Sequence, residues 1–154
     1  MGKRLRVAVV YGGRSGEHEV SLRSAAAVIA NLDPERYEVV PVAIGKEGSW
    51  RTGPESLEVL ERAQRELAPI PPHGHEVTLP PDPTRGGLVP VAGGPPIAVD
   101  VVFPVLHGTY GEDGTVQGVF ELADVSYVGP GPLGAAIGMD KDVAKRLLVQ
   151  AGIP

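Results

Sequence analysis

The apolar positions of the first 70 residues alternate between strand-like and helix-like patterns. Residues 5–11 form a short apolar run rich in β-branched side chains, which predicts a buried strand. Apolar side chains recur at helical spacing over residues 22–32, and a second strand-like run follows at 38–44. After a predicted turn region at 45–53, one apolar stripe over 57–67 predicts another helix.

The same alternation returns near residue 100. Residues 100–106 predict a strand, Thr115 can cap a helix, and residues 126–128 predict a short strand. Two further helices are expected to begin at Pro132 and, with a side-chain cap, at Asp140. Alternating strands and helices predict an α/β fold of three layers, with a mostly parallel sheet and helices on both faces.

Residues 69–96 have a different composition, with nine of the chain's 16 prolines. We expect a solvated insertion or hairpin that adds nothing to the core, with Val77–Leu79 and Leu88–Val91 as candidate edge strands. His73 and His75 lack a third ligand in this loop, so no metal site is predicted there.

Composition narrows the classes of function. The 154 residues fit one domain, and 42% of them are hydrophobic. Net charge is −5 with no cluster of Lys and Arg, which argues against nucleic-acid binding. No apolar run approaches the ~20 residues that span a bilayer. We expect a cytoplasmic protein without a membrane partner; the absence of cysteine excludes disulfides but says little about the compartment.

The candidate chemistry lies in loops after two predicted strands, where ligands bind in parallel sheets. The first loop, residues 12–21, reads GGRSGEHEVS and opens a helix whose free N–H groups favour an anion. Glu17 and Glu19 fit a zwitterionic ligand such as an amino acid, with its ammonium paired to a carboxylate. The alternative, equally weighted, is that both are ordinary acids of a first helical turn.

The second loop, residues 107–118, reads HGTYGEDGTVQG. His107 can donate a hydrogen bond to a substrate carboxylate or transfer a proton. Glu112 and Asp113 are expected to be structural, accepting N–H groups of the loop and the helix start, and no metal site is predicted from them. A third glycine cluster at 129–134 matches G-x-G-x-x-G, but its two prolines remove N–H donors, so we interpret it as a turn.

Four segments in order give a specific resemblance. The pattern GG-x-S-x-EH-x-VS at 12–21 and the pattern HG-x-x-GEDGT-x-QG at 107–118 resemble the two signatures of D-alanine–D-alanine ligases. Y-x-G at 127–129 and MDK at 139–141 continue the resemblance, which covers the chain apart from 69–96. It implies a Rossmann-like domain that precedes an ATP-grasp domain.

The resemblance implies an enzyme that activates one D-alanine with ATP as an acyl phosphate and joins it to a second D-alanine for peptidoglycan. Glu17 would bind the ammonium of the first D-alanine, and Ser21 would help to orient the loop. His107 would contact the substrate's carboxylate. These three are the expected catalytic residues, and Val20 and Gly108 complete the expected substrate-binding set. D-alanine is the expected partner, and a homodimer is kept as an expectation because exposed parts of such domains often pair.

Residues 1–139 are expected to form the substrate-binding domain, and 140–154 a helix leading to central and C-terminal ATP-grasp domains. Lys141 would reach ATP phosphates, whereas the ligands of Mg²⁺ would come from those further domains, so this chain alone is expected to be inactive. Ligases that use D-lactate or D-serine as second substrate remain alternatives. Two further alternatives are a non-catalytic module that binds an amino acid and a remnant with only a structural role.

Overall fold

The computed structural model describes residues 2–65 and 74–153 of the chain. Its elements follow one another in the order β1 (Leu5–Gly12), α1 (His18–Asn31), β2 (Tyr37–Ile44), β3 (Trp50–Thr52), α2 (Pro54–Arg65), β4 (His75–Thr78), η1 (Pro83–Arg85), β5 (Val89–Pro90), β6 (Val101–Pro104), α3 (Thr115–Leu122), α4 (Pro132–Met139) and α5 (Lys141–Gln150).

The strands form one mixed sheet in the order β5-β4-β3-β2-β1-β6. β1 pairs in parallel with β2 and with β6, whereas β3, β4 and β5 are added in antiparallel pairs. The expected α/β fold is confirmed, but the sheet is parallel only over β2-β1-β6. The turn of residues 45–49 is too short for a crossover, so β3 can only return beside β2 in the antiparallel direction.

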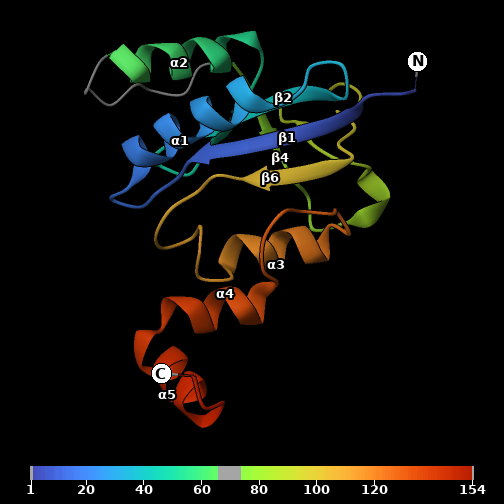
Figure 1. The fold of residues 1–154 in the computed structure, drawn as a ribbon. Helices are drawn as coiled ribbons and strands as arrows, with labels where there is room; N and C mark the ends of the chain where they lie inside the picture. Colours follow the sequence, from blue (N-terminus) through green and yellow to red (C-terminus); the bar gives the residue numbers. More distant parts are fainter. Residues whose placement is uncertain (1, 66–73, 154) are drawn as a thin grey trace.

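Helices cover the sheet on both faces, as expected (Figure 1). α1 and α2 lie on one face and α3 on the other, and α4 and α5 form a lobe beyond α3. α5 packs against α4 rather than against the sheet. The described structure has no helix long and apolar enough to cross a membrane.

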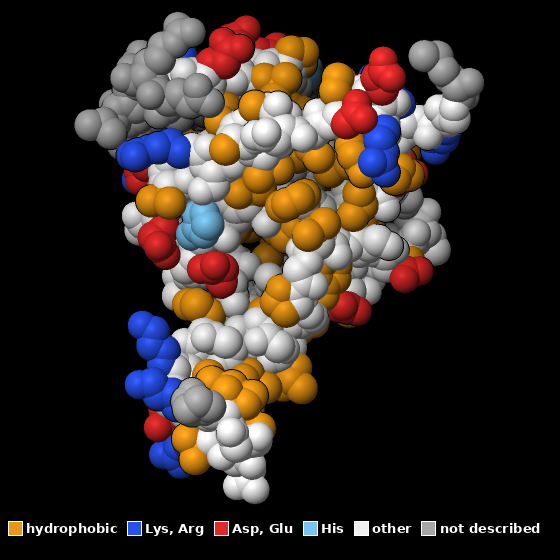
Figure 2. Space-filling model, in the orientation of Figure 1, with side chains coloured by type: hydrophobic (Ala, Val, Ile, Leu, Met, Phe, Trp, Pro, Cys, Tyr) orange, Lys and Arg blue, Asp and Glu red, His pale blue; other side chains and the backbone are white. Residues whose placement is uncertain are grey.

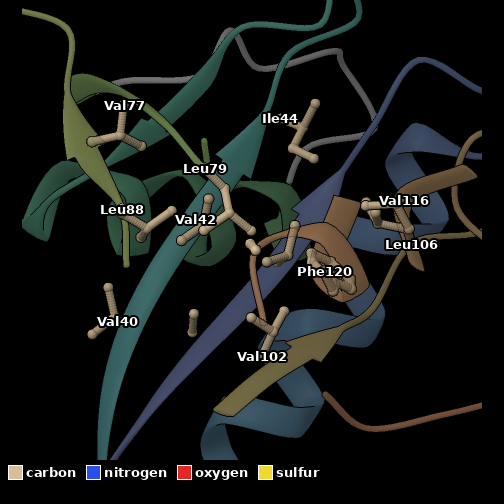
Figure 3. Close-up of a cluster of buried hydrophobic side chains, with 13 residues drawn as sticks. Val40, Val42, Ile44, Val77, Leu79, Leu88, Val102, Leu106, Val116 and Phe120 are labelled. Atoms are coloured by element: carbon tan, nitrogen blue, oxygen red, sulfur yellow. The ribbon is translucent and has the colours of Figure 1, made fainter. Parts of the chain in front are cut away.

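Two apolar clusters hold these layers together. The cluster between the sheet and α3 is centred on the fully buried Phe120 and includes strand residues such as Val42 and Val102 (Figure 3). On the opposite face, Val9 and Tyr11 of β1 pack with Leu22 of α1. Alternate residues of β1 thus face opposite layers, which is the pattern of a central strand buried on both sides.

The Pro-rich segment adds more to the core than the sequence predicts. β4 and β5 pair as antiparallel strands, and Val77, Leu79 and Leu88 are buried in the cluster beneath α3 (Figure 3). The expectation of a segment without core residues is therefore wrong. These strands extend the sheet past β3, so their inward side chains share its apolar face. Residues 69–73, including His73, lie outside the described residues.

Helix ends agree with the sequence at one site and differ at another. Asp140 Oδ1 accepts the N–H groups of Asp142 and Val143, so the predicted cap of α5 is confirmed. α3 instead has Gly114 as its N-cap, and Asp113 accepts the N–H of Thr115 at 3.0 Å. The predicted cap Thr115 is therefore the first helical residue, because the preceding aspartate already satisfies that orphan N–H.

Candidate functional site

The two glycine-rich loops meet at the carboxyl edge of β1 and β6, and Ser15 joins them. The buried Ser15 hydroxyl donates to the His107 carbonyl at 2.6 Å and accepts the Glu17 N–H at 3.1 Å. α1 lies on one face of the sheet and α3 on the other, so the crevice between β1 and β6 is where the connections diverge. That is the usual ligand position in a doubly wound sheet.

Glu17 lies beside this edge, and its exposed side chain leaves the carboxylate available. Glu17 is the N-cap residue of α1, but its side chain makes no capping hydrogen bond. A Cβ atom added to Gly108 would lie 2.7 Å from Glu17 Oε2, so the carboxylate rests directly against the glycine backbone. The described residues provide no ion pair for Glu17, whereas Glu19 pairs with Lys46 at 2.6 Å. Glu19 lies in the first turn of α1, as the alternative interpretation expects, and Glu17 is the N-cap residue just before it.

The His107 imidazole spans the same crevice between α1 and the second loop. Its Nε2 lies 3.2 Å from the Ser24 hydroxyl of α1, and its Nδ1 lies 3.8 Å from Glu112 Oε1. The other oxygen of Glu112 accepts the Gly108 N–H at 2.7 Å. The ring is thus held by Ser24 at the end of β6, close to the backbone on which Glu17 rests.

The structural roles predicted for the two acids of the second loop are confirmed. Glu112 accepts the Gly108 N–H, and Asp113 accepts the N–H groups of Tyr110 at 2.8 Å and Thr115 at 3.0 Å. Burial raises the pKa of Asp113, but these hydrogen bonds together outweigh it and leave the pKa below its ordinary value. The second loop is therefore preorganised by its own carboxylates.

Ser21 is placed differently from the other expected site residues. Its side chain is fully buried, and its hydroxyl donates to the Val105 carbonyl and accepts the Gly12 N–H at 2.8 Å. Both interactions stay within the protein, so Ser21 positions the ends of β1 and β6. Val20, one residue earlier, is 48% exposed and remains available to line the crevice.

Replacing Ser21 with Ala is expected to lower the free energy of unfolding by about 1–3 kcal/mol, because a buried N–H and a buried carbonyl lose their partner. Urea denaturation followed by circular dichroism measures this change. Ser126, whose side chain is exposed, is the matched control, and Ser126→Ala should stay within about 0.5 kcal/mol of the parent chain. Equal stability of the two variants would contradict the bridging role of Ser21.

Lys141 lies outside the cluster of the two loops. It is exposed in the first turn of α5, whose packing partner is α4. The adjacent N–H groups already bind Asp140, so a phosphate would meet the Lys141 ammonium but no free helix N-terminus. The described residues include no group of three His, Cys, Asp or Glu side chains able to hold a metal ion. By themselves, these residues therefore do not form a Mg²⁺ site.

Sequence reasoning missed two positioning residues, Ser15 and Ser24. Ser24 falls seven residues after Glu17, which places both on one side of α1 and gives a signal that spacing could have supplied. Ser15 belongs to the signature at 12–21, but its partner could not be predicted, because its bond to His107 joins residues 92 positions apart.

The fold and these loops define an α/β domain in which a carboxylate without an ion pair and an imidazole flank one glycine at the carboxyl edge of the sheet, the usual ligand position in this class. Comparison with known proteins agrees with this class. The sequence family described as D-ala D-ala ligase N-terminus matches residues 6–130, and the chain belongs to this family.

Similar proteins carry the ligase name. The D-alanine–D-alanine ligase A of Bradyrhizobium diazoefficiens is 56% identical over 100% of this chain and 42% of its own length. The D-alanine–D-alanine ligase of Rhodococcus jostii is 55% identical over 98% of this chain and 42% of its own length. The chain thus spans less than half the length of these relatives.

Solved structures show the same fold. The D-Ala:D-Ser ligase VanG of Enterococcus faecalis matches with a TM-score of 0.83 at 38% identity, over 98% of this chain and 43% of that one. The D-alanine–D-alanine ligase of Coxiella burnetii matches with a TM-score of 0.82 at 31% identity, over 98% and 43%.

Proposed function

We propose that this domain provides the first D-alanine subsite of a cytoplasmic D-alanine–D-alanine ligase, which forms the dipeptide for peptidoglycan with ATP and Mg²⁺. The observation that carries the proposal is the unpaired Glu17 carboxylate, which lies against Gly108 beside His107. Two relatives that are more than half identical to this chain bear the name of that enzyme.

The residues of the crevice bind and orient the substrate. Glu17 pairs with the D-alanine ammonium, because an ammonium near the positive N-terminus of α1 needs a compensating carboxylate. His107 donates a hydrogen bond from Nδ1 to the substrate carboxylate, since Nδ1 lies 3.8 Å from Glu112, too far for a hydrogen bond, while Ser24 holds Nε2. Val20 and Gly108 then form walls of the subsite. ATP supplies the phosphoryl group that activates the bound carboxylate, and this chain fixes the orientation in which that carboxylate is presented.

The alternatives differ in what lies outside the first subsite. A D-Ala:D-Ser ligase shares the fold at 38% identity, but the curated relatives at 50–56% identity are named for D-alanine alone. We therefore favour D-alanine as second substrate as well. A non-catalytic amino-acid module would need Glu17 but not Lys141. A homodimer stays a prediction.

Titration of the 154-residue chain with D-alanine, followed by amide NMR, tests this proposal. We expect saturable shifts at Glu17 and Gly108 with a dissociation constant in the millimolar range, about −4 kcal/mol, since the domain supplies part of the contacts. The Glu17→Gln variant should lose these shifts. Shifts confined to other parts of the chain would contradict the assigned subsite.

Lys141 can be tested in a chimera in which this chain replaces the matching N-terminal part of the Bradyrhizobium ligase. Lys141→Ala is expected to raise the KM for ATP roughly tenfold, as the loss of one charge-assisted contact predicts. Lys145→Ala, in the next turn of the same helix and also exposed, is the control and should leave this KM unchanged. An unchanged KM for ATP in Lys141→Ala would remove the phosphate role of Lys141.

A further inference from the structure

A second pocket of about 320 Å³ lies on the α3 side of the carboxyl edge. It opens between the loop after β1, the β2–β3 turn and the loop after β6. Its apolar wall is formed by Ile44, Trp50, Leu106, Val116 and Val119. Of these, Ile44, Leu106 and Val116 belong to the buried cluster drawn in Figure 3, so the wall is a fixed part of the core. We call this cavity the loop pocket.

One side of the loop pocket carries an available cation. The Arg14 guanidinium lies 4.6 Å from the centre of the Tyr110 ring, and both residues line the pocket. Within residues 2–65 and 74–153, Arg14 makes no ion pair with an acidic side chain. A guanidinium stacked on an aromatic ring keeps the N–H donors at its edge, which match a carboxylate. Tyr110 holds this position with φ of +66°, a strained value for a non-glycine residue.

The turn between β2 and β3 supplies an anion to the same pocket. Glu47 lines it, and the Ser49 hydroxyl donates to the Glu47 carboxylate. This hydrogen bond lowers the pKa of Glu47, so the side chain is charged at neutral pH. Glu47 has no ion pair with a basic side chain in the described structure. Arg14 packs its side-chain carbons against Gly48, yet the two opposite charges do not neutralise each other.

The loop pocket is separate from the D-alanine subsite. Glu17, Val20, Ser21 and Gly108 do not line the loop pocket, and His107 is the one residue that both share. Its apolar wall is also far more extensive than an alanine methyl group requires. About 320 Å³ falls at the lower end of typical ligand sites, roughly 300–1,000 Å³.

We propose that the loop pocket binds an amino acid with a large apolar side chain. Its carboxylate pairs with Arg14, its ammonium pairs with Glu47, and its side chain covers the wall formed by Trp50 and Val119. Such a ligand satisfies both unpaired charges at once and removes the apolar wall from water. This second site does not depend on the proposed ligase function.

Phenylalanine and two matched analogues are suitable probes. 3-Phenylpropionate lacks only the ammonium, and 2-phenylethylamine lacks only the carboxylate. Trp50 is the chain's only tryptophan, so its fluorescence, excited at a wavelength the phenyl ring does not absorb, and its single indole N–H resonance both report on the pocket. We expect phenylalanine to bind at least about tenfold more tightly than either analogue, because each analogue loses one charge-assisted contact. Equal affinity for all three, or no change in either signal, would overturn the proposal.

Charge-removing variants test the two contacts one at a time. Arg14→Gln should weaken phenylalanine and 3-phenylpropionate but not 2-phenylethylamine, and Glu47→Gln should weaken phenylalanine and 2-phenylethylamine but not 3-phenylpropionate. The control Arg36→Gln removes a cation stacked on Tyr37, which does not line the pocket, and should change no affinity. Glu17→Gln should also leave phenylalanine binding unchanged. A loss of binding in Glu17→Gln would place phenylalanine in the D-alanine subsite and overturn the separate site.

Discussion

Replacing Glu17 with Gln in the chimera described above is expected to raise the KM for the first D-alanine roughly 10- to 100-fold, the equivalent of about 1.5–3 kcal/mol for a hydrogen bond to a charged group. The carboxylate rests against Gly108 and has no ion pair within the described residues, so its charge is available to the substrate ammonium. Glutamine keeps the size of the side chain but cannot form that ion pair. Steady-state kinetics with D-alanine varied at saturating ATP measure the effect.

Glu19→Gln is the matched control, because Glu19 is the same type of residue two positions after Glu17, in the first turn of α1. Its carboxylate is held by Lys46 at 2.6 Å, and this contact lowers its pKa. We expect the KM for D-alanine to stay within about twofold, because Lys46 already pairs with this carboxylate. The fold should also survive the change, since an exposed ion pair of this kind contributes about 0–1 kcal/mol to stability. Similar KM values for the Glu17 and Glu19 variants would contradict the assignment of Glu17 to the substrate ammonium.

Gly12→Ala is expected to reduce the free energy of unfolding by about 3 kcal/mol or more, as backbone strain and a steric clash add together. Gly12 ends β1 with φ of +88°, and a Cβ atom there would lie 2.3 Å from the Ile44 carbonyl oxygen and 3.0 Å from His18 Cε1. That carbonyl already accepts the Gly13 N–H, so it cannot move without breaking the turn that leads to Glu17. Chemical denaturation of the 154-residue chain measures the loss.

Gly118→Ala tests whether this cost comes from the geometry of Gly12. Gly118 lies inside α3, has no left-handed φ, and a Cβ atom there would have nothing within 4 Å. Alanine is the better helix former by about 1 kcal/mol, so this variant should be more stable than the parent chain. If Gly12→Ala were as stable as Gly118→Ala, the result would contradict the close contact between the first loop and the end of β2.

The sequence predicts the central part of the fold because its signals are local. The apolar run of β1 and the helical spacing of α1 each depend on neighbouring residues, and Asp140 caps α5 through N–H groups two and three positions away. The positions of Glu17 and His107 follow in turn, because loops after adjacent parallel strands must meet at one edge of the sheet.

The antiparallel half of the sheet could not be predicted in the same way. β3 is three residues long and β5 only two, too short for a period of two to be recognised. The surrounding prolines argue against core strands in the sequence, yet Val77, Leu79 and Leu88 are buried. Their burial depends on long-range pairing with β3. The contact between Arg14 and Tyr110 likewise joins two loops 96 positions apart, and no local pattern encodes it.

We propose that this chain orients the first D-alanine for a reaction that further domains of a ligase complete. D-alanine-dependent release of ADP, with ATP and Mg²⁺, should be measured side by side for the purified 154-residue chain and for the chimera. We predict no release from the chain alone, since its described residues offer no Mg²⁺ site, and clear D-alanine-dependent release from the chimera. Turnover by the chain alone, or a folded chimera that releases no ADP, would contradict this account.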